Sequence, residues 1–169
     1  MIRAARSADL PALREVESAA GAMFHDLGMT AVANDEPLSL AELATYQEDG
    51  RAWVATDDAD RPVAYLLVDV VDANAYVEQV SVHPGHARQG LGKALLDTAA
   101  SWARQRGLAA LTLTTYSEVP WNAPYYRRLG FDVVPADDQG PGLRRLRAHE
   151  ADIGLDRWPR VAMARRLDR

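Results

Sequence analysis

The sequence contains no cysteine. Disulfide bonds, catalysis by a cysteine thiolate and zinc sites built from cysteine are therefore excluded. Lysine is nearly as rare, since Lys93 is the single example, whereas arginine and alanine are abundant. This imbalance is typical of codon bias in a GC-rich bacterial genome, so we expect a bacterial origin and assign no chemical role to it.

Long apolar segments are missing as well. No apolar run approaches the roughly 18 residues that a membrane-spanning helix needs, and Met1–Arg6 lacks the apolar core of a secretory signal peptide. Acidic residues exceed basic ones by 24 to 19, which gives a formal net charge of -5. This charge offers no broad attraction to nucleic acid or to anionic membranes. We therefore expect a cytoplasmic protein that binds neither.

Hydrophobic periodicity indicates one mixed α/β domain over residues 1–169. Short turns between the early strands predict antiparallel neighbours, and a later strand–helix–strand segment predicts a parallel pair. Predicted strands cover 2–6, 52–56, 62–71, 75–83, 108–115, 131–134 and 160–164. Predicted helices follow the cap Ser7–Asp9 and cover 39–47, 91–107, 122–129 and 144–150, whereas 21–38 and 135–142 lack a clear period.

The most informative segment is Val80–Leu96, a strand that leads through a glycine-rich turn directly into a helix. The first N–H groups of a helix have no partner inside it and carry partial positive charge. Gly90 and Gly92 remove the side chains that would keep a phosphate away from these donors. Arg88 and Lys93 add positive charge, so the turn is suited to a pyrophosphate.

Two common phosphate-binding motifs do not fit this segment. A P-loop requires a glycine where Ala87 stands and a hydroxyl residue where Ala94 stands. A dinucleotide-binding fingerprint requires a third glycine at the position of Leu95, and it follows the first strand of a βαβ unit. Neither motif is therefore indicated.

The turn resembles motif A of the GNAT N-acetyltransferases, Arg/Gln-x-x-Gly-x-Gly/Ala. Ala87 departs from the pattern at its first position, with Arg88 one step later, so the resemblance there concerns the backbone donors. Further along, residues 121–131 look like motif B of the same family, Tyr-x-x-x-Gly-Phe, through Tyr126, Gly130 and Phe131. The two motifs occur in the family's order, and the resemblance covers about residues 63–134.

The resemblance implies a GNAT-like fold, in which a mixed, mostly antiparallel central sheet is flanked by helices and two central strands splay apart to form a slot for acetyl-CoA. It implies acetyl-CoA as co-substrate and no metal, and it allows a homodimer. A β-bulge is expected near Val80, where it aims an N–H at the thioester carbonyl. The residues that the resemblance assigns to coenzyme binding are Val80, Ser81, Val82, Arg88, Gln89, Gly90, Leu91, Gly92, Lys93 and Asn122.

Acetyl transfer to an amine needs a group that takes a proton from the amine. Glu78, close to the expected bulge, is the candidate base and Glu118 is the reserve, although either carboxylate also fits a solvated strand end. His83 and His86 are candidate relays or plain surface residues. The resemblance assigns the leaving thiolate to Tyr126. Because tyrosine (pKa about 10) is a weaker acid than a thiol (about 8.5), that residue acts either through a late hydrogen bond or with a lowered pKa.

These residues predict an acetyl-CoA-dependent N-acetyltransferase that acts on a primary amine of a small molecule. Two alternatives stay open, a protein or peptide N-acetyltransferase and a non-catalytic module that senses acyl-CoA. A closed apolar pocket near Phe24, Trp121 and Tyr125 would favour the small molecule, whereas an open face would favour a peptide. The sequence shows no His/Asp/Glu cluster with metal-ligand spacing.

Overall fold

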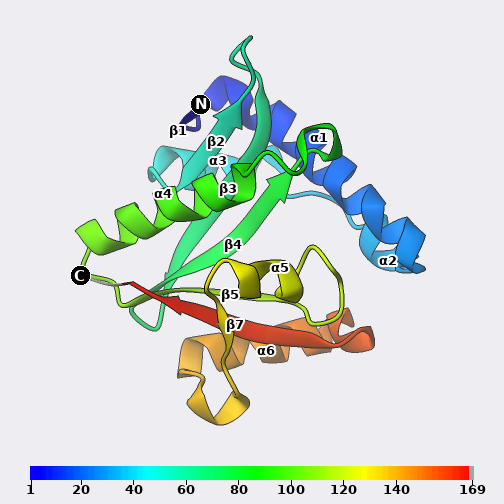
Figure 1. Ribbon diagram of the computed structural model, residues 1–169, viewed down its shortest axis with the longest axis vertical. Coiled ribbons are helices and arrows are strands. Elements are labelled where there is room, and N and C mark those ends of the chain that lie inside the picture. The colour runs from blue at the N-terminus through cyan, green and yellow to red at the C-terminus, as the bar shows by residue number, and fades with distance from the viewer. Residues whose placement is uncertain (168–169) are drawn as a thin grey trace. The chain divides into compact units, whose positions relative to one another are not determined.

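The computed structural model describes residues 1–167, so the last two residues of the predicted domain lie outside the described residues. Within this range seven strands are hydrogen-bonded in the order β1-β2-β3-β4-β5-β7-β6 (Figure 1). The strands are β1 (Ile2–Ala4), β2 (Ala52–Thr56), β3 (Pro62–Val71), β4 (Asn74–Val82), β5 (Ala110–Tyr116), β6 (Asp132–Val133) and β7 (Arg160–Arg166). The α-helices are α1 (Leu10–Gly21), α2 (Thr30–Ala33), α3 (Leu40–Glu48), α4 (Leu91–Gln105), α5 (Ala123–Arg128) and α6 (Pro141–Asp152).

The predicted mixed, mostly antiparallel sheet is confirmed. Strands β1, β2 and β3 pair antiparallel, as do β5, β6 and β7. Strands β4 and β5 pair in parallel, with Ala75 opposite Leu111 and Tyr76 opposite Thr112. The expected splay of these two strands beyond their parallel pairs stays a prediction. Between residues 1 and 167, no helix has the length and apolar character to cross a membrane.

The chain divides into two compact units. Unit 1 consists of Met1–Val68 and Glu78–Thr98, and unit 2 consists of Asp69–Val77 and the chain from Ala99 onward. The hydrophobic core of unit 1 forms where α1 and α3 pack against β2 and β3. Leu10, Leu13 and Val16, the stripe predicted for α1, contact this core together with Leu43 of α3 and Tyr65 of β3.

The segment without a clear period in unit 1 contains two short helical pieces, a 3-10 helix at Ala22–Leu27 and α2. Glycine at position 28 ends the first piece with a φ of 70°. The next helix, α3, begins after Ser39, whose hydroxyl accepts a hydrogen bond from the N–H of Glu42 (3.1 Å). The Glu42 carboxylate accepts in turn from the N–H of Ser39 (3.1 Å), which completes a capping box and explains why this helix was predictable.

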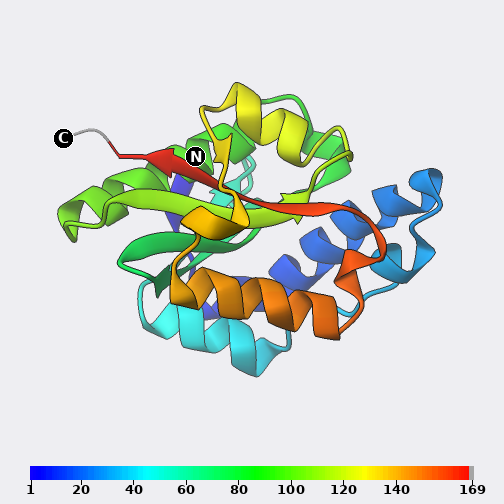
Figure 2. The ribbon, with the colours of Figure 1, turned by 90° about the horizontal axis from the view of Figure 1, so that it is seen from below.

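Unit 2 packs α6 against β5 and β7, and the helix runs below the red strand β7 in Figure 2. Tyr76, Leu143 and Ala162 form its small apolar cluster. The first turn of α6 is capped by Asp72, whose two carboxylate oxygens accept from the N–H groups of Gly142 (2.8 Å) and Leu143 (2.9 Å). This cap connects the β3–β4 turn to the helix.

Several element boundaries in unit 2 differ from the sequence predictions by one to three residues. The helix predicted at 144–150 extends over Pro141–Asp152, because proline is well accommodated in the first helical turn and Asp72 supplies a cap from a distant part of the chain. The strand predicted at 131–134 is limited to Asp132–Val133. The N–H of Val134 still donates to the carbonyl of Ala162 (2.8 Å), so the chain remains connected to β7 beyond that strand.

The start of α1 is organised by a buried ion pair, where a cap at Ser7–Asp9 was predicted. The guanidinium of Arg3 donates to both carboxylate oxygens of Asp9 (2.7 and 3.1 Å), and the N–H of Arg6 donates to the same carboxylate (2.7 Å). Burial alone would raise the pKa of Asp9, but the hydrogen bonds from Arg3 and Arg6 lower it below its usual value. The charged form of Asp9 is therefore favoured by folding.

We expect Asp9→Asn to lower the free energy of unfolding by about 1–3 kcal/mol near neutral pH, because it removes one partner of a buried charged hydrogen-bond pair. A lowered pKa in the folded state stabilises above the unfolded pKa of about 3.9 and is lost as the pH falls through the folded value. Urea titrations of both proteins at neutral pH and near pH 3 measure this difference. The loss of unfolding free energy should be smaller at the acidic pH. Asp58→Asn, in an exposed turn, is the control and should have little effect at either pH. An equal loss for Asp9→Asn at both pH values would contradict the electrostatic explanation.

Candidate functional site

The predicted phosphate-binding turn lies between β4 and α4 in unit 1. The first intrahelical hydrogen bond of α4 runs from the N–H of Ala94 to the carbonyl of Gly90 (3.0 Å). The N–H groups of Leu91, Gly92 and Lys93 therefore stand in the first turn, where a helix offers them no internal partner. These are the donors that the sequence assigned to a pyrophosphate.

Two residues of this turn have left-handed backbone conformations. Gly90 has a φ of 75°, and a Cβ added there would meet nothing within 4 Å. Arg88 has a φ of 63° although it carries a side chain, a conformation that costs about 1–2 kcal/mol for L-residues. Strained residues of this kind concentrate at ligand-binding and catalytic sites. The surface of the turn is exposed, so these positions are accessible from solvent.

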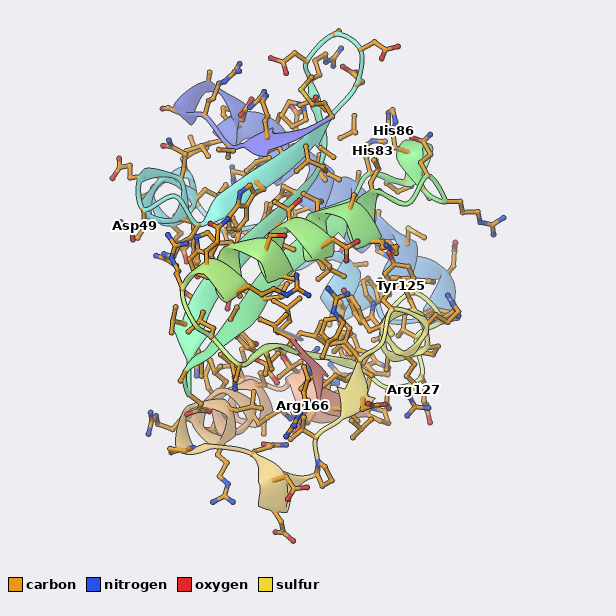
Figure 3. All side chains as sticks on the ribbon, turned by 60° about the vertical axis from the view of Figure 1, so that its left-hand side comes forward. Asp49, His83, His86, Tyr125, Arg127 and Arg166 are labelled. Atoms are coloured by element: carbon orange, nitrogen blue, oxygen red, sulfur yellow. The ribbon has the colours of Figure 1, made fainter. Side chains whose placement is uncertain are left out.

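The charged side chains of the turn differ in their surroundings. Lys93 forms an exposed ion pair with Asp97 (2.8 Å), one helical turn further along α4. His83 is a structural cap, because its Nδ1 accepts from the N–H of Gly85 (3.0 Å). The rings of His83 and His86 meet edge to face (6.2 Å between centroids), and Figure 3 shows them together at the turn. A proton relay through the Nδ1 of His83 would require the loss of its hydrogen bond from Gly85.

Strand β4 has one residue more than the part of β3 that it faces. The turn Asp72–Ala73 has two residues with positive φ (54° and 60°), and this hairpin type makes residues 71 and 74 neighbours. At the other end of the pair, the N–H of His83 donates to the carbonyl of Val63 (2.9 Å). From residue 74 to residue 83 the β4 side advances nine residues, whereas the β3 side advances only eight, from residue 71 to residue 63. One residue of β4 is therefore extra, which defines a β-bulge. The bulged span includes Val80, near which the bulge was expected.

The candidate base and the strand residues assigned to the coenzyme share unit 1 with the turn. Glu78 is half-buried in the second part of β4, as are Val80 and Val82. Ser81 is buried, and its hydroxyl accepts a hydrogen bond from the side chain of Gln79 (2.7 Å). Their predicted roles toward a ligand stay predictions.

Tyr126 lies on α5 in unit 2 and is buried. Its ring packs edge to face against Phe131 (5.7 Å between centroids) and Tyr125 (5.4 Å). The N–H of Phe131 also donates to the carbonyl of Tyr126 (3.1 Å), while Gly130 between them adopts a φ of 92°. Burial, followed by the neighbouring Tyr125, raises the pKa of Tyr126 well above its ordinary value. The hydroxyl is therefore held in its protonated form.

The other predicted residues of unit 2 surround this helix. The side-chain oxygen of Asn122 accepts from the N–H of Tyr116 (3.4 Å), which links the start of α5 to β5. Trp121 and Tyr125 are half-buried, whereas Glu118 is exposed. Phe24 belongs to unit 1, and the predicted pocket that combines it with the two aromatic residues stays a prediction. Among residues 1–167, no group of histidine and carboxylate side chains is arranged to hold a metal ion.

A buried polar network in unit 2 escaped the sequence analysis. The Glu150 carboxylate of α6 accepts from Thr114 (2.5 Å), from Arg147 (2.7 Å) and from Arg160 (3.3 Å). The hydroxyl of Tyr76 is hydrogen-bonded to that of Thr114 (3.2 Å). These residues lie up to 84 positions apart in the sequence, so no local spacing indicated the network.

Comparison with known protein families adds an independent result. The family described as Acetyltransferase (GNAT) family matches residues 16–131, a span that contains the turn, Glu78 and Tyr126. A curated protein called Histone acetyltransferase TAP1, from Glycine max, is 39% identical over 67 residues. That alignment covers 40% of this chain and 28% of the curated protein, so the chain spans less than a third of that relative's length.

Two solved structures are similar in fold. The ribosomal-protein-S18-alanine N-acetyltransferase from Escherichia coli matches with a TM-score of 0.68 and 22% identity, over 100% of this chain and 94% of that chain. The PaiA N-acetyltransferase from Thermoplasma acidophilum, solved in complex with coenzyme A, matches with a TM-score of 0.72 and 15% identity, over 98% of each chain. At these identities the likeness concerns the fold, and the predicted fold class is confirmed.

The raised pKa of Tyr126 gives a spectroscopic prediction. Up to about pH 11, one unit above the usual tyrosine value, the wild type and Tyr126→Phe should develop the same ultraviolet tyrosinate absorbance. In guanidinium chloride, where the residue is exposed, the wild type should show one tyrosine more. If the folded wild type showed one tyrosinate more than folded Tyr126→Phe below that pH, Tyr126 would not be protonated and the prediction would be wrong.

Proposed function

The chain belongs to the GNAT family of acetyltransferases, and from this membership we propose that it transfers the acetyl group of acetyl-CoA directly to a primary amine of a small molecule. The observation that supports the proposal most is the strand–turn–helix segment between β4 and α4. Its free first-turn N–H groups and its two left-handed residues suit the pyrophosphate of coenzyme A. The coenzyme A complex of the similar PaiA structure supports the same co-substrate.

In this proposal the coenzyme is held by backbone groups more than by side-chain charge. The N–H groups of residues 91–93 and the backbone of Val80 and Val82 bind it, with Ser81, Gln89 and Asn122 alongside. Arg88 supplies positive charge next to the phosphates, while Lys93 contributes less because Asp97 already neutralises part of its charge. The β4 bulge directs an N–H toward the thioester carbonyl, where it would stabilise negative charge in the transition state.

The base is needed because the acceptor is protonated at neutral pH. For an alkylamine with a pKa of about 10.4, the loss of its proton at pH 7 costs about 4.6 kcal/mol. We propose that Glu78 takes this proton from the ammonium group, directly or through a water molecule, before the neutral amine nitrogen attacks the thioester carbon. Glu118 is a weaker candidate because it is exposed, which suits a solvated carboxylate better than a base.

The acid side of the reaction belongs to Tyr126. When the carbon–sulfur bond breaks, the electron pair stays on sulfur, and the Tyr126 hydroxyl donates a hydrogen bond to the thiolate. The sequence left open a tyrosine with a lowered pKa, but its pKa is raised, so full proton transfer to sulfur is unfavourable. We therefore propose a hydrogen bond that strengthens as charge develops, with solvent completing the protonation.

A protein or peptide N-acetyltransferase is the second candidate. Two comparisons favour it, since both the Glycine max relative and the Escherichia coli structure are named for acting on proteins. A screen that follows thiol release from acetyl-CoA, with a library of small amines and of peptides with free amino termini or lysines, separates the two. Turnover of peptides alone would refute the small-molecule assignment, and binding of acetyl-CoA without any turnover would favour a sensor.

We also propose, from its composition, that the protein is a cytoplasmic bacterial enzyme. We further propose that it forms a homodimer, which a measurement of its molecular mass in solution would test.

We expect Tyr126→Phe to reduce kcat about 10- to 100-fold, which corresponds to about 1.4–2.7 kcal/mol of lost transition-state stabilisation. The dissociation constant for coenzyme A should change less than about threefold, because the hydroxyl acts on the leaving group. Steady-state kinetics and calorimetry measure the two effects. Undiminished turnover would show that another group serves the thiolate.

A matched pair of glycine variants tests the turn. Gly90→Ala and Gly107→Ala both place a side chain at a strongly positive φ (75° and 70°) with no neighbour within 4 Å. Both should therefore lose a similar stability of about 1 kcal/mol. Only Gly90→Ala should weaken coenzyme A binding, by about tenfold in calorimetry, because Gly107 lies at the far end of α4. Equal affinities in the two variants would contradict the proposed binding turn.

A further inference from the structure

The side chain of Tyr65 carries a polar group that the fold leaves without a partner. Tyr65 lies on β3 and is fully buried, with 0% of its surface exposed. Among residues 1–167, no group forms a hydrogen bond of normal geometry with its hydroxyl. An unsatisfied buried hydroxyl costs about 1–3 kcal/mol, so each such group in a folded protein requires an explanation. A bound molecule that completes the hydrogen bond would provide one.

Two carboxylates and one hydroxyl group influence the hydroxyl of Tyr65. Glu17 of α1 and Ser81 of β4 are near enough to affect the pKa of Tyr65, and the charge of Glu78 reaches it as well. Burial and the charge of Glu17 together raise that pKa well above the ordinary value, so the hydroxyl stays neutral. We call Glu17, Tyr65, Glu78 and Ser81 the Glu17 cluster; all four residues belong to unit 1.

Glu17 is fixed in position but its charge is not neutralised by an ion pair. One oxygen of its carboxylate accepts from the N–H of Leu38 (3.1 Å), and no salt bridge to Glu17 is present in the described part of the chain. Arg14, one turn earlier on α1, directs its Nε to the carbonyl of Leu38 (3.0 Å). Burial is the main cause that raises the pKa of Glu17, and the negative charge of Asp35 raises it further. The N–H of Leu38 and the nearby hydroxyl of Tyr65 oppose this rise without cancelling it.

The cluster therefore combines the charge of Glu17, which no ion pair in the described part of the chain neutralises, with a buried hydroxyl whose oxygen accepts no hydrogen bond there. A cation bound there would favour the ionised form of Glu17, and its N–H groups could donate to the oxygen of Tyr65. The Tyr65 hydroxyl would then donate its own hydrogen to Glu17 or Ser81. A neutral or anionic ligand would not provide the positive charge.

We propose that the Glu17 cluster binds a second, charged amino group of the acceptor, so that the acceptor is a diamine or a longer polyamine. This inference rests on the proposed function, in which Glu78 serves the amino group that reacts. The reacting nitrogen has to be neutral when it attacks, so it cannot balance the charge of Glu17. A second nitrogen that stays protonated can, and it would fix the acceptor by two points.

Putrescine and butylamine test this assignment, because they share a four-carbon chain and differ by one amino group. The wild type should use putrescine with a kcat/KM at least about tenfold higher, the equivalent of one good charged contact. Glu17→Gln should reduce the putrescine-to-butylamine ratio about tenfold, mainly through the KM for putrescine. Tyr65→Phe should reduce the same ratio about threefold to tenfold without lowering the melting temperature, because it removes a hydroxyl that lacks a partner.

Glu15→Gln is the matched control, since Glu15 is an exposed carboxylate on the same helix and should leave the ratio at the wild-type value. A wild type that uses both amines equally, or a Glu17→Gln variant that keeps the ratio, would overturn the proposal while leaving acetyl transfer intact. If no amine is acetylated at all, the proposed function fails instead. In that case calorimetry with putrescine alone still tests the Glu17 cluster. The proposal requires putrescine to bind the wild type more tightly than it binds Glu17→Gln.

Discussion

The passage from β4 to α4 is the constraint on which the proposed activity depends. The chain leaves a strand and begins a helix within a few residues, and it does so through left-handed conformations at Arg88 and Gly90. A helix that starts in this way leaves its first N–H groups without partners inside the helix. Glycine at 90 provides this geometry at little cost, while Arg88 accepts strain. An anion that binds these donors uses a site that the backbone has already formed.

Two buried tyrosines illustrate how similar environments support different roles. Burial keeps both Tyr126 and Tyr65 protonated. Tyr126 is packed among aromatic rings, without a carboxylate among the causes of its raised pKa, and therefore suits donation of a hydrogen bond to a developing anion. Tyr65 stands among carboxylates and suits a cation that donates to its oxygen. The neighbouring charges, more than the residue type, determine what each hydroxyl can do.

The buried ions of unit 2 serve its architecture. Glu150 is nine-tenths buried and receives hydrogen bonds from Thr114, Arg147 and Arg160. An ion pair of this kind adds little net stability compared with apolar packing, yet loss of one partner leaves an uncompensated buried charge. The network therefore connects α6 to β5 and β7.

The sheet class, most element boundaries and the two family motifs could be predicted from the amino-acid sequence, because each depends on short-range patterns. Alternating or three-to-four apolar spacing, a capping box at Ser39 and Glu42, and glycines at 90 and 92 act within a few residues of one another. The bulge in β4 was also expected, from the resemblance. The sequence did not determine the full length of α6, whose cap Asp72 lies about seventy residues away.

The raised pKa of Tyr126 and the proximity of Glu17 to Tyr65 could not be predicted in this way, because both arise from folding. A pKa depends on burial and on charges brought close by folding, neither of which a local pattern records. Glu17 and Tyr65 are separated by nearly fifty residues and share no motif, so their contact arises only when α1 packs against β3. The proposed chemistry of the turn depends on local residues and could be read from the sequence, whereas the proposed choice of acceptor depends on side chains from distant elements.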